Sequence, residues 1–177
     1  MGVRRAEAQT GRMNLKPSVP MLRDIQLLSE FDDVELAHLV AQGECRHYEA
    51  HANIVIEGEN SWGLYLILDG AVGVFKRNKL TGQNYDLAQL RKGNFFGEMS
   101  LIDRSPRSAS VKALTSCTVY HISGEAFHSF LSQRPDTKIR FYESCVKLLV
   151  TRLRDLGDDY VVSQYQLWKF ALKKEAA

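Results

Sequence analysis

Hydrophobic residues recur in three different ways along the chain, and these patterns predict where helices and strands lie. Between residues 19 and 30 the apolar positions are three or four residues apart, which is typical of one face of a short helix. A second helix is expected to follow, because Asp32 and Asp33 form a plausible N-cap pair and Gly43 is well placed to end it. The chain therefore begins its ordered part with helices.

From Cys45 to Ile122 the pattern changes to short runs of strand-forming residues, separated by Gly, Asn and Asp. A hairpin turn is expected at 80–83. The sequence predicts strands at 45–49, 53–57, 63–69, 71–76, 85–90, 109–114 and 117–122. Many short strands with frequent turns predict a mainly β fold with flanking helices, a β-sandwich or jelly-roll β-barrel.

The C-terminal part returns to a helical pattern. Ser123 is expected to cap one helix, and Pro135 to close it and open the next. A heptad-like seam then alternates spacings of three and four, and only Ser163 breaks the series: Ile139, Tyr142, Val146, Leu149, Leu153, Leu156, Tyr160, Leu167 and Phe170. A second stripe on a neighbouring face holds Cys145, Leu148 and Arg152.

These two stripes favour a homodimer through residues 139–170, in which one stripe covers the β domain and the other meets a partner helix. The alternative is a single amphipathic helix that folds back on its own barrel. Gly157, followed by Asp158 and Asp159, predicts a kink or break in this helix.

The chain thus divides into three parts: a flexible N-terminal arm over 1–18, a β-barrel with flanking helices over 19–134, and a long helical lid and dimerisation segment over 135–177. The arm is basic and is either a disordered tail or a docking segment. The net charge of +2 gives no whole-molecule field for nucleic acid, and no stretch approaches the length of a membrane span.

The three cysteines are far apart, which fits neither a disulfide framework nor a zinc site. We expect buried, inert thiols in a reducing cytoplasm. The five histidines lack the close spacing of a jelly-roll metal site, and no nucleophile–base arrangement is evident. The sequence therefore predicts a protein that is not an enzyme and holds no metal.

The densest chemistry lies in residues 93–110. Gly93 and Gly97 allow tight backbone bends, and a helical turn that starts at Glu98 would expose amides that attract an anion. Arg107 can reach over the same turn, and Glu98 can accept hydrogen bonds from hydroxyls. Together these groups predict a sugar phosphate site. The alternative is an internal ion pair between Glu98 and Arg107 that merely closes a loop.

This run resembles the phosphate-binding cassette of cyclic nucleotide-binding domains, the family of catabolite activator protein and the regulatory subunit of protein kinase A. The family pattern F-G-E-x-[AS]-L-x-x-x-x-P-R-x-A-[ST] stands here at 96–110 with no fixed position missing. Residues 67–74 also match the family's I-x-x-G-x-V-x-V strand pair. The resemblance covers about residues 20–157 and implies a jelly-roll barrel with N-terminal helices and a long C-terminal helix.

Position by position, the resemblance implies a binding site for a cyclic nucleotide, cAMP more than cGMP. Arg107 would pair with the cyclic phosphate, and Glu98 would take the ribose 2′-hydroxyl. The remaining ligand-binding positions that it implies are the Gly97, Met99, Ser100 and Ser108 amides, the cassette residue Ala109, and the purine walls Val74 and Leu87.

The chain departs from the family pattern at two places in its last helix. Where relatives often read the base with a polar side chain, this sequence has Leu156 and Gly157, so Arg152 or Arg154 could stack on the purine instead. Only 20 residues follow Gly157, so a winged helix-turn-helix and direct DNA binding are not expected. The predicted function is a stand-alone, non-catalytic receptor that signals to a partner protein through its helices. The alternative is an interaction module of the same fold that binds no nucleotide, or a different one such as a cyclic dinucleotide.

Overall fold

The computed structural model describes residues 16–175 of the chain. Three short helical segments come first, and two helices end the chain. In chain order the elements are α1 (Val19–Arg23), the 3-10 helix η1 (Gln26–Leu28), α2 (Asp33–Gln42), β1 (Glu44–Tyr48), β2 (Asn53–Val55), β3 (Gly63–Asp69), β4 (Ala71–Arg77), β5 (Asn84–Arg91), β6 (Phe95–Phe96), α3 (Glu98–Asp103), β7 (Ser110–Ala113), β8 (Cys117–Ser123), α4 (Gly124–Ser132) and α5 (Pro135–Glu175).

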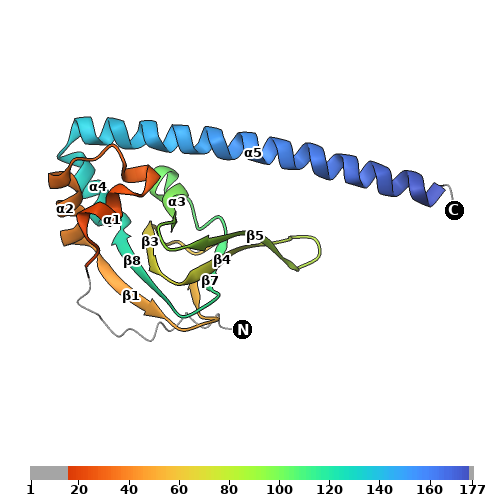
Figure 1. The fold of residues 1–177 in the computed structure, drawn as a ribbon, viewed down its shortest axis with the longest axis horizontal. Coiled ribbons are helices and arrows are strands. Elements are labelled where there is room, and N and C mark those ends of the chain that lie inside the picture. The colour runs from red at the N-terminus through yellow and green to blue at the C-terminus, as the bar shows by residue number, and fades with distance from the viewer. Residues whose placement is uncertain (1–15, 176–177) are drawn as a thin grey trace.

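The strands form two separate antiparallel sheets of four strands each, in the orders β1-β8-β3-β6 and β2-β7-β4-β5 (Figure 1). This arrangement confirms the mainly β fold with flanking helices and a long C-terminal helix. Of the β-sandwich and the jelly-roll β-barrel that the sequence left open, the structure has two sheets that do not close as a barrel, because no ladder among the described residues joins the edge strands of one sheet to those of the other. The hairpin expected at 80–83 connects β4 to β5.

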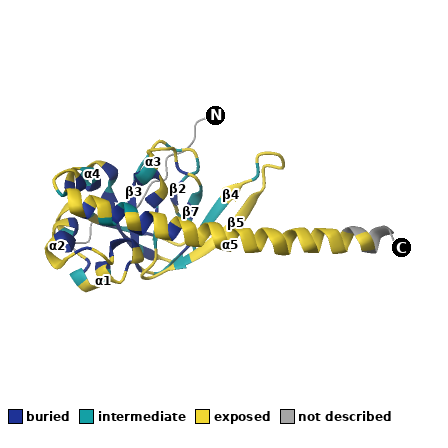
Figure 2. Ribbon diagram, turned by 90° about the horizontal axis from the view of Figure 1, so that it is seen from above, coloured by how far each residue is buried: buried dark blue, intermediate teal, exposed yellow. Residues whose placement is uncertain are grey.

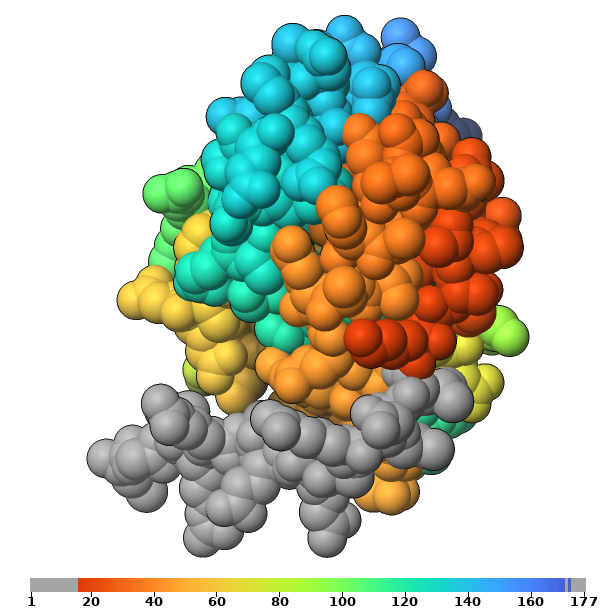
Figure 3. Space-filling model, turned by 90° about the vertical axis from the view of Figure 1, so that its left-hand side faces the viewer, coloured from red at the N-terminus to blue at the C-terminus, as the bar shows by residue number. Residues whose placement is uncertain are grey.

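The core has two layers because strand β3 is buried on both faces. Leu64 and Leu66 of β3 pack with the helices, whereas Tyr65 and Ile67 point into the space between the two sheets. The helical layer joins segments distant in sequence: Phe31, before α2, contacts Phe141 of α5, with their ring centroids 6.5 Å apart. Figure 3 shows α2 beside α4 and the start of α5 at this end of the molecule.

The helix starts follow the expected capping residues. Asp32 and Glu35 form a reciprocal capping box at α2, and the Ser123 hydroxyl accepts a hydrogen bond from the amide of Ala126 at α4. The first expected helix is instead broken, since α1 ends at Arg23 and Ile25 is extended before η1. One continuous helix would turn Leu27 away from the face that holds Leu22, whereas the break lets both side chains be buried.

Helix α5 is a single helix of 41 residues, so the break expected at Gly157 was wrong (Figures 1 and 2). A glycine inside a helix costs only about 1 kcal/mol relative to alanine, and the helical residues on either side of Gly157 offset this cost. The buried residues of α5 all lie in its first third: Thr137, Phe141, Ser144, Cys145 and Leu148. Beyond Leu148 every described side chain of α5 is exposed.

The heptad-like seam lies mainly on the outer side of α5, away from the domain. Ile139, Val146 and Leu153 are 58%, 60% and 69% exposed, while Cys145 and Leu148 of the second stripe are buried. The alternative in which α5 simply folds back on its own domain therefore does not account for the seam. The second stripe covers the domain, and the seam is left exposed.

Three smaller expectations concern the cysteines, the metal and the membrane. Cys45, Cys117 and Cys145 are buried, as expected, and form no disulfide, and burial raises the pKa of Cys117 to about 11 and that of Cys145 to about 12. Among residues 16–175, no helix has the length and apolar character to cross a membrane, and no cluster of metal-ligating side chains occurs. The N-terminal arm lies outside the described residues up to position 15.

Candidate functional site

The candidate site begins at the turn between β6 and α3, which requires glycine. Gly97 has a φ of 89°, and a Cβ atom there would lie 2.4 Å from the carbonyl oxygen of Gly63 and 2.7 Å from Nη1 of Arg107. Any side chain would therefore collide with the backbone of β3 and displace the guanidinium. The helical turn expected after this glycine is α3.

Arg107 is held in one orientation by contacts on two sides of its guanidinium. Its Nε donates to the Ser61 hydroxyl at 3.1 Å, and its Nη1 donates to the Ser100 hydroxyl at 2.8 Å and to the Gly63 carbonyl at 3.1 Å. The guanidinium also lies 5.4 Å from the centre of the Tyr65 ring. These contacts fix the plane and direction of the Arg107 side chain.

The second amino group of Arg107 has no such contacts. Arg107 is only 4% exposed, and its Nη2 is buried without a hydrogen-bond partner among the described residues. Burial lowers the pKa of Arg107, because a charged guanidinium loses its hydration there. A fixed, buried cation with an unused donor is suited to an anion that enters the same cavity.

Glu98 is buried and pairs with the long C-terminal helix. Its side chain is 4% exposed, and Nη1 of Arg152 donates a hydrogen bond to its Oε1. Among the described residues, no salt bridge joins Glu98 to Arg107, so the loop-closing ion pair considered from the sequence is not formed. Glu98 instead ties α5 to the turn that carries α3, across 54 residues of sequence.

These residues line one cavity of about 520 Å³ between the β2-β7-β4-β5 sheet, the β6–α3 turn and α5. The cavity brings together every ligand-binding residue expected from the sequence: Val74, Leu87, Gly97, Glu98, Met99, Ser100, Arg107, Ser108 and Ala109. Arg152 and Leu156 also line it, as the sequence suggested for this helix, whereas Arg154 does not. Their roles toward a ligand are taken up below as proposals.

Sequence reasoning missed two polar residues of the cavity wall, Asp155 and Asp159. A usable signal was present, because Asp155 stands three residues after Arg152 and Asp159 three after Leu156. These spacings keep residues on one face of a helix. The expected break at Gly157 obscured that register.

Two apolar side chains of the wall, on β5 and α3, are largely exposed. Leu87 on strand β5 is 56% exposed, and Met99 on α3 is 44% exposed. The Ser108 hydroxyl lies 3.6 Å from the sulfur of Met99. The cavity is therefore polar around Arg107 and Glu98 and apolar toward β4 and β5.

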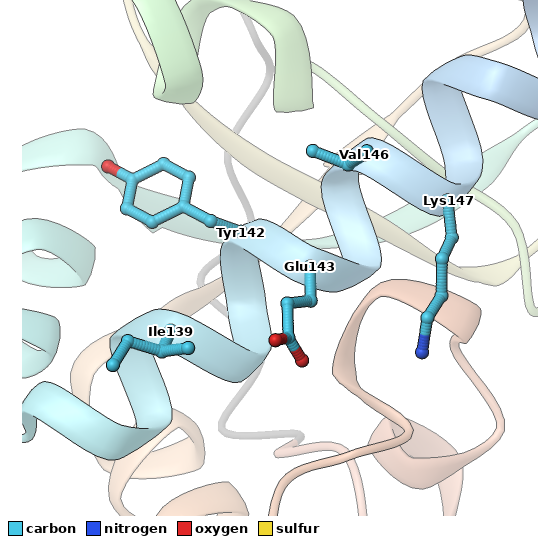
Figure 4. A pocket seen from close by; sticks show the side chains of 5 residues that line it. All are labelled: Ile139, Tyr142, Glu143, Val146 and Lys147. Carbon is cyan, nitrogen blue, oxygen red and sulfur yellow. The ribbon is translucent and has the colours of Figure 1, made fainter.

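A second hollow, of about 650 Å³, lies on the first third of α5 (Figure 4). The residues that line it all belong to α5: Ile139, Tyr142, Glu143, Val146 and Lys147. It contains three members of the outward seam, Ile139, Tyr142 and Val146. It belongs to the exposed face of α5 rather than to the cavity at Arg107.

A comparison with protein families decides the assignment. The model of the cyclic nucleotide-binding domain matches residues 45–134. The chain belongs to this family. The matched residues include the strands of both sheets, the β6–α3 turn and Arg107. The structure of this cyclic nucleotide-binding domain continues beyond the match into α5.

Two relatives of this cyclic nucleotide-binding domain are longer proteins that are named as regulators. The chain is 29% identical over 110 residues to a cAMP-dependent protein kinase regulatory subunit of Neurospora crassa, covering 62% of this chain and 28% of that protein. It is 28% identical over 127 residues to the cAMP-activated global transcriptional regulator CRP of Salmonella typhimurium, covering 71% and 60%. The chain thus spans less than two thirds of either relative.

A solved cyclic nucleotide-binding domain from Methylobacillus flagellatus has a similar fold. It superposes with a TM-score of 0.68 at 26% identity, over 80% of this chain and 83% of that one. The mainly β fold with flanking helices and a long C-terminal helix, which the cassette implied, is therefore confirmed.

Proposed function

We propose that this chain is a non-catalytic receptor for a cyclic nucleotide, which signals to a partner protein through its helices. The observation that carries the proposal is that Arg107, which lines the cavity, has a buried Nη2 without a hydrogen-bond partner among the described residues. The two relatives described above are named for cAMP, so cAMP is the first ligand to test.

The proposed ligand orientation follows from the charges of the cavity. The cyclic phosphate takes the free donors of Arg107, which relieves the cost of a buried, partly unpaired cation. The ribose 2′-hydroxyl donates to Glu98, beside the Gly97 turn, while the amides of Met99, Ser100 and Ser108 and the residue Ala109 complete the wall around the phosphate. The purine lies between the apolar side chains of Val74 and Leu87.

The link to a signal is the ion pair between Glu98 and Arg152. A ribose hydroxyl that donates a hydrogen bond to Glu98 alters the ion pair between this carboxylate and Arg152 on α5. In this proposal α5 has two arrangements. Ligand binding then shifts the population between them, to an extent set by the difference in the ligand's affinity for each. The exposed half of α5 presents this change to another molecule.

The outward seam over residues 139–170 supports a homodimer as the receptor's assembly. A helix of 41 residues is about 60 Å long, and most of that length has an apolar stripe in water. A second copy that aligns its own α5 with this helix would bury the outward seam of each copy. Three buried cysteines without a disulfide are compatible with a reducing, cytoplasmic location.

Titration calorimetry of the full chain with cAMP and with cGMP tests the receptor proposal. Wild-type protein should bind with a 1:1 stoichiometry per chain. Arg107→Ala should weaken binding by at least a hundredfold, because a bound phosphate would lose its only buried cation. Arg107→Lys keeps the charge but loses the planar guanidinium, so its affinity should lie between that of the wild type and that of Arg107→Ala.

Arg154→Ala is the matched control, since Arg154 is an exposed arginine on α5 that does not line the cavity. It should bind as the wild type does. If folded wild-type protein releases no heat with either nucleotide, the receptor proposal is wrong. The interaction module without a cyclic mononucleotide, or with a cyclic dinucleotide, would then take its place.

A further inference from the structure

Among the described residues that line the cavity, one carries a sulfur atom that the proposed ligand contacts leave unused. Met99, in the first turn of α3, is 44% exposed. Its Sδ accepts a hydrogen bond from the Ser108 hydroxyl, which lies 3.6 Å away. Ser108 also lines the cavity and directly follows Arg107 in the sequence. The thioether therefore lies beside the proposed phosphate contact.

The other sulfur atoms of the described chain are better protected. Cys45, Cys117 and Cys145 are 5%, 0% and 2% exposed, and burial raises the pKa of each thiol. A raised pKa removes the thiolate, which is the form that oxidants attack. Met21 on α1 is partly buried and packs against the helical layer of the core. Among residues 16–175, Met99 is therefore the sulfur-containing residue most open to a small oxidant.

A peroxide converts a thioether into a sulfoxide by transferring one oxygen atom. The sulfur lone pair attacks the peroxide, so that an S–O bond forms and the O–O bond breaks. With hydrogen peroxide, the second oxygen atom leaves as water. The sulfur is oxidised by two electrons and the peroxide is reduced by two. The flexible, apolar side chain thus becomes polar and carries an acceptor oxygen.

This new oxygen would compete with an anionic ligand for the same donors. A thioether sulfur is only a weak acceptor, whereas a sulfoxide oxygen is a strong one. The Ser108 hydroxyl already contacts the sulfur, so it would bond to the sulfoxide and be lost to a ligand that enters the cavity. The partial negative charge on this oxygen also opposes a phosphate held by Arg107. Oxidation should therefore weaken the binding of a phosphate ligand.

We propose that Met99 is a site of reversible oxidation by a peroxide, and that its sulfoxide lowers the affinity of the cavity for a cyclic nucleotide. The inference rests on the proposed function, in which Arg107 holds the cyclic phosphate. Methionine sulfoxide reductases convert the product back to methionine, so the loss of affinity is reversible. A bound nucleotide, in turn, covers Met99 and slows its oxidation.

Dissociation constants for cAMP and cGMP, measured on the full chain before and after treatment with hydrogen peroxide, test this inference. Peptide mass spectrometry of the same samples measures the oxygen gained at Met99. Full conversion should weaken binding by about three- to tenfold, which is the usual size of one lost hydrogen bond. Treatment with methionine sulfoxide reductases of both epimer specificities should restore the affinity.

Met99→Leu is the matched variant, because leucine has a similar apolar volume and no sulfur to oxidise. Whatever its own affinity, that affinity should not change after peroxide treatment. Every other sulfur atom remains in this variant, so a loss equal to that of the wild type would assign the effect to another residue and overturn the inference. Met21→Leu is the control, and it should lose as much affinity on treatment as the wild type does.

Protection by the ligand gives a second readout that does not depend on an affinity measurement after oxidation. A saturating nucleotide should slow the oxidation of Met99 at least threefold and leave that of Met21 unchanged, because Met21 does not line the cavity. Equal rates at Met99 with and without a nucleotide that binds would overturn the inference.

Two further outcomes separate this inference from the receptor proposal. If the untreated wild type binds a nucleotide and complete oxidation of Met99 leaves the dissociation constant unchanged, only the role of Met99 is wrong. If the folded, untreated wild type binds neither nucleotide, both proposals fail. Thermal unfolding without ligand should give the same midpoint before and after treatment. A lower midpoint after treatment would assign the lost affinity to a damaged fold and would overturn the inference.

Discussion

The first third of α5 and the remainder of the helix contain similar apolar residues but lie in opposite environments. Phe141 is 1% exposed and packs on Phe31 and Phe127, whereas Phe170, on the same helix, is 72% exposed. The first part is held by tertiary packing. The second part has exposed side chains, is tied to the domain by the Arg152–Glu98 ion pair near its start, and otherwise depends on helix propensity and on whatever it binds.

This difference teaches that an apolar stripe alone does not tell a core from an interface. The buried residues of the second stripe end at Leu148, while the outward seam continues for about 20 more residues to Phe170. One helix therefore closes the domain with its first part and presents a surface with its second. Variants placed on either side of this division should have clearly different effects.

The largest expected effect comes from a matched pair of phenylalanines. Phe141→Ala should lower the free energy of unfolding by about 3–5 kcal/mol, because it leaves a cavity where the helices meet the first sheet. Phe170→Ala should change it by less than about 0.5 kcal/mol. Urea unfolding at low protein concentration measures both. Similar losses in the two variants would contradict the division of α5.

The second-largest effect concerns the loss of stability in acid, which we expect in the packed part of the domain and not in the exposed part of α5. His121 in β8 is 9% exposed, and burial, with a smaller effect of Arg46, lowers its pKa to about 3. In the unfolded chain its pKa is about 6.5. The unfolded state therefore takes up a proton that the folded state does not, so stability falls as the pH drops from 6.5 toward 3, by up to about 1.4 kcal/mol per pH unit.

His121→Gln should flatten this part of the stability curve, by about 2–3 kcal/mol between pH 6.5 and 4.5. No histidine occurs in α5, so this pH dependence does not arise in the exposed part of α5. Fluorescence of Trp62, in a Trp168→Phe background, follows the body alone. An unchanged slope in His121→Gln would contradict the assignment.

The same division explains how far the sequence could predict the molecule. Strands, turns and capping residues are local features, so β3, β4 and the cap at Ser123 lie where the pattern placed them. Gly97 and Arg107 were found because the cassette is a contiguous motif. Local patterns were sufficient for these parts.

The parts that failed depend on contacts between distant segments. The ion pair of Glu98 with Arg152, and the Ser61 contact of Arg107, join residues 54 and 46 positions apart, which no local pattern displays. The break in the first helix follows from the need to bury Leu27 together with Leu22. Closure of the barrel likewise depends on the pairing of edge strands, and local composition does not determine that pairing.

A third prediction concerns the outward seam and the proposed homodimer. Leu153 is 69% exposed at the centre of the seam, so Leu153→Glu should raise the dimer dissociation constant at least tenfold by placing a charge at the helix contact. The unfolding free energy of the monomer should change by less than about 0.5 kcal/mol. Sedimentation velocity over a series of concentrations measures the dissociation constant.

Thr151→Glu is the control for this variant, since it adds the same side chain two residues away, on another face of α5. It should leave the dimer intact. If both variants associate as the wild type does, the seam is not the contact between copies. If the wild type is monomeric at every concentration, the homodimer proposal fails.

The smallest effect should come from two glycines that differ only in backbone conformation. A Cβ atom at Gly157 or at Gly58 would have nothing within 4 Å, but Gly58 has a φ of +83° while Gly157 is helical. Gly157→Ala should stabilise the exposed half of α5 by about 0.5–1 kcal/mol. Gly58→Ala should instead destabilise the domain by about 1 kcal/mol, because an L-residue is strained in the left-handed region.

Hydrogen exchange of the α5 amides after residue 150 measures the first change, and urea unfolding measures the second. The added methyl group meets open space at both sites, so packing cannot account for opposite signs. Slower exchange in Gly157→Ala would agree with a helix that runs unbroken from the domain into its exposed half. Faster exchange would mean that the helix bends at Gly157 after all, and the exposed seam would then no longer be continuous with the packed part of α5.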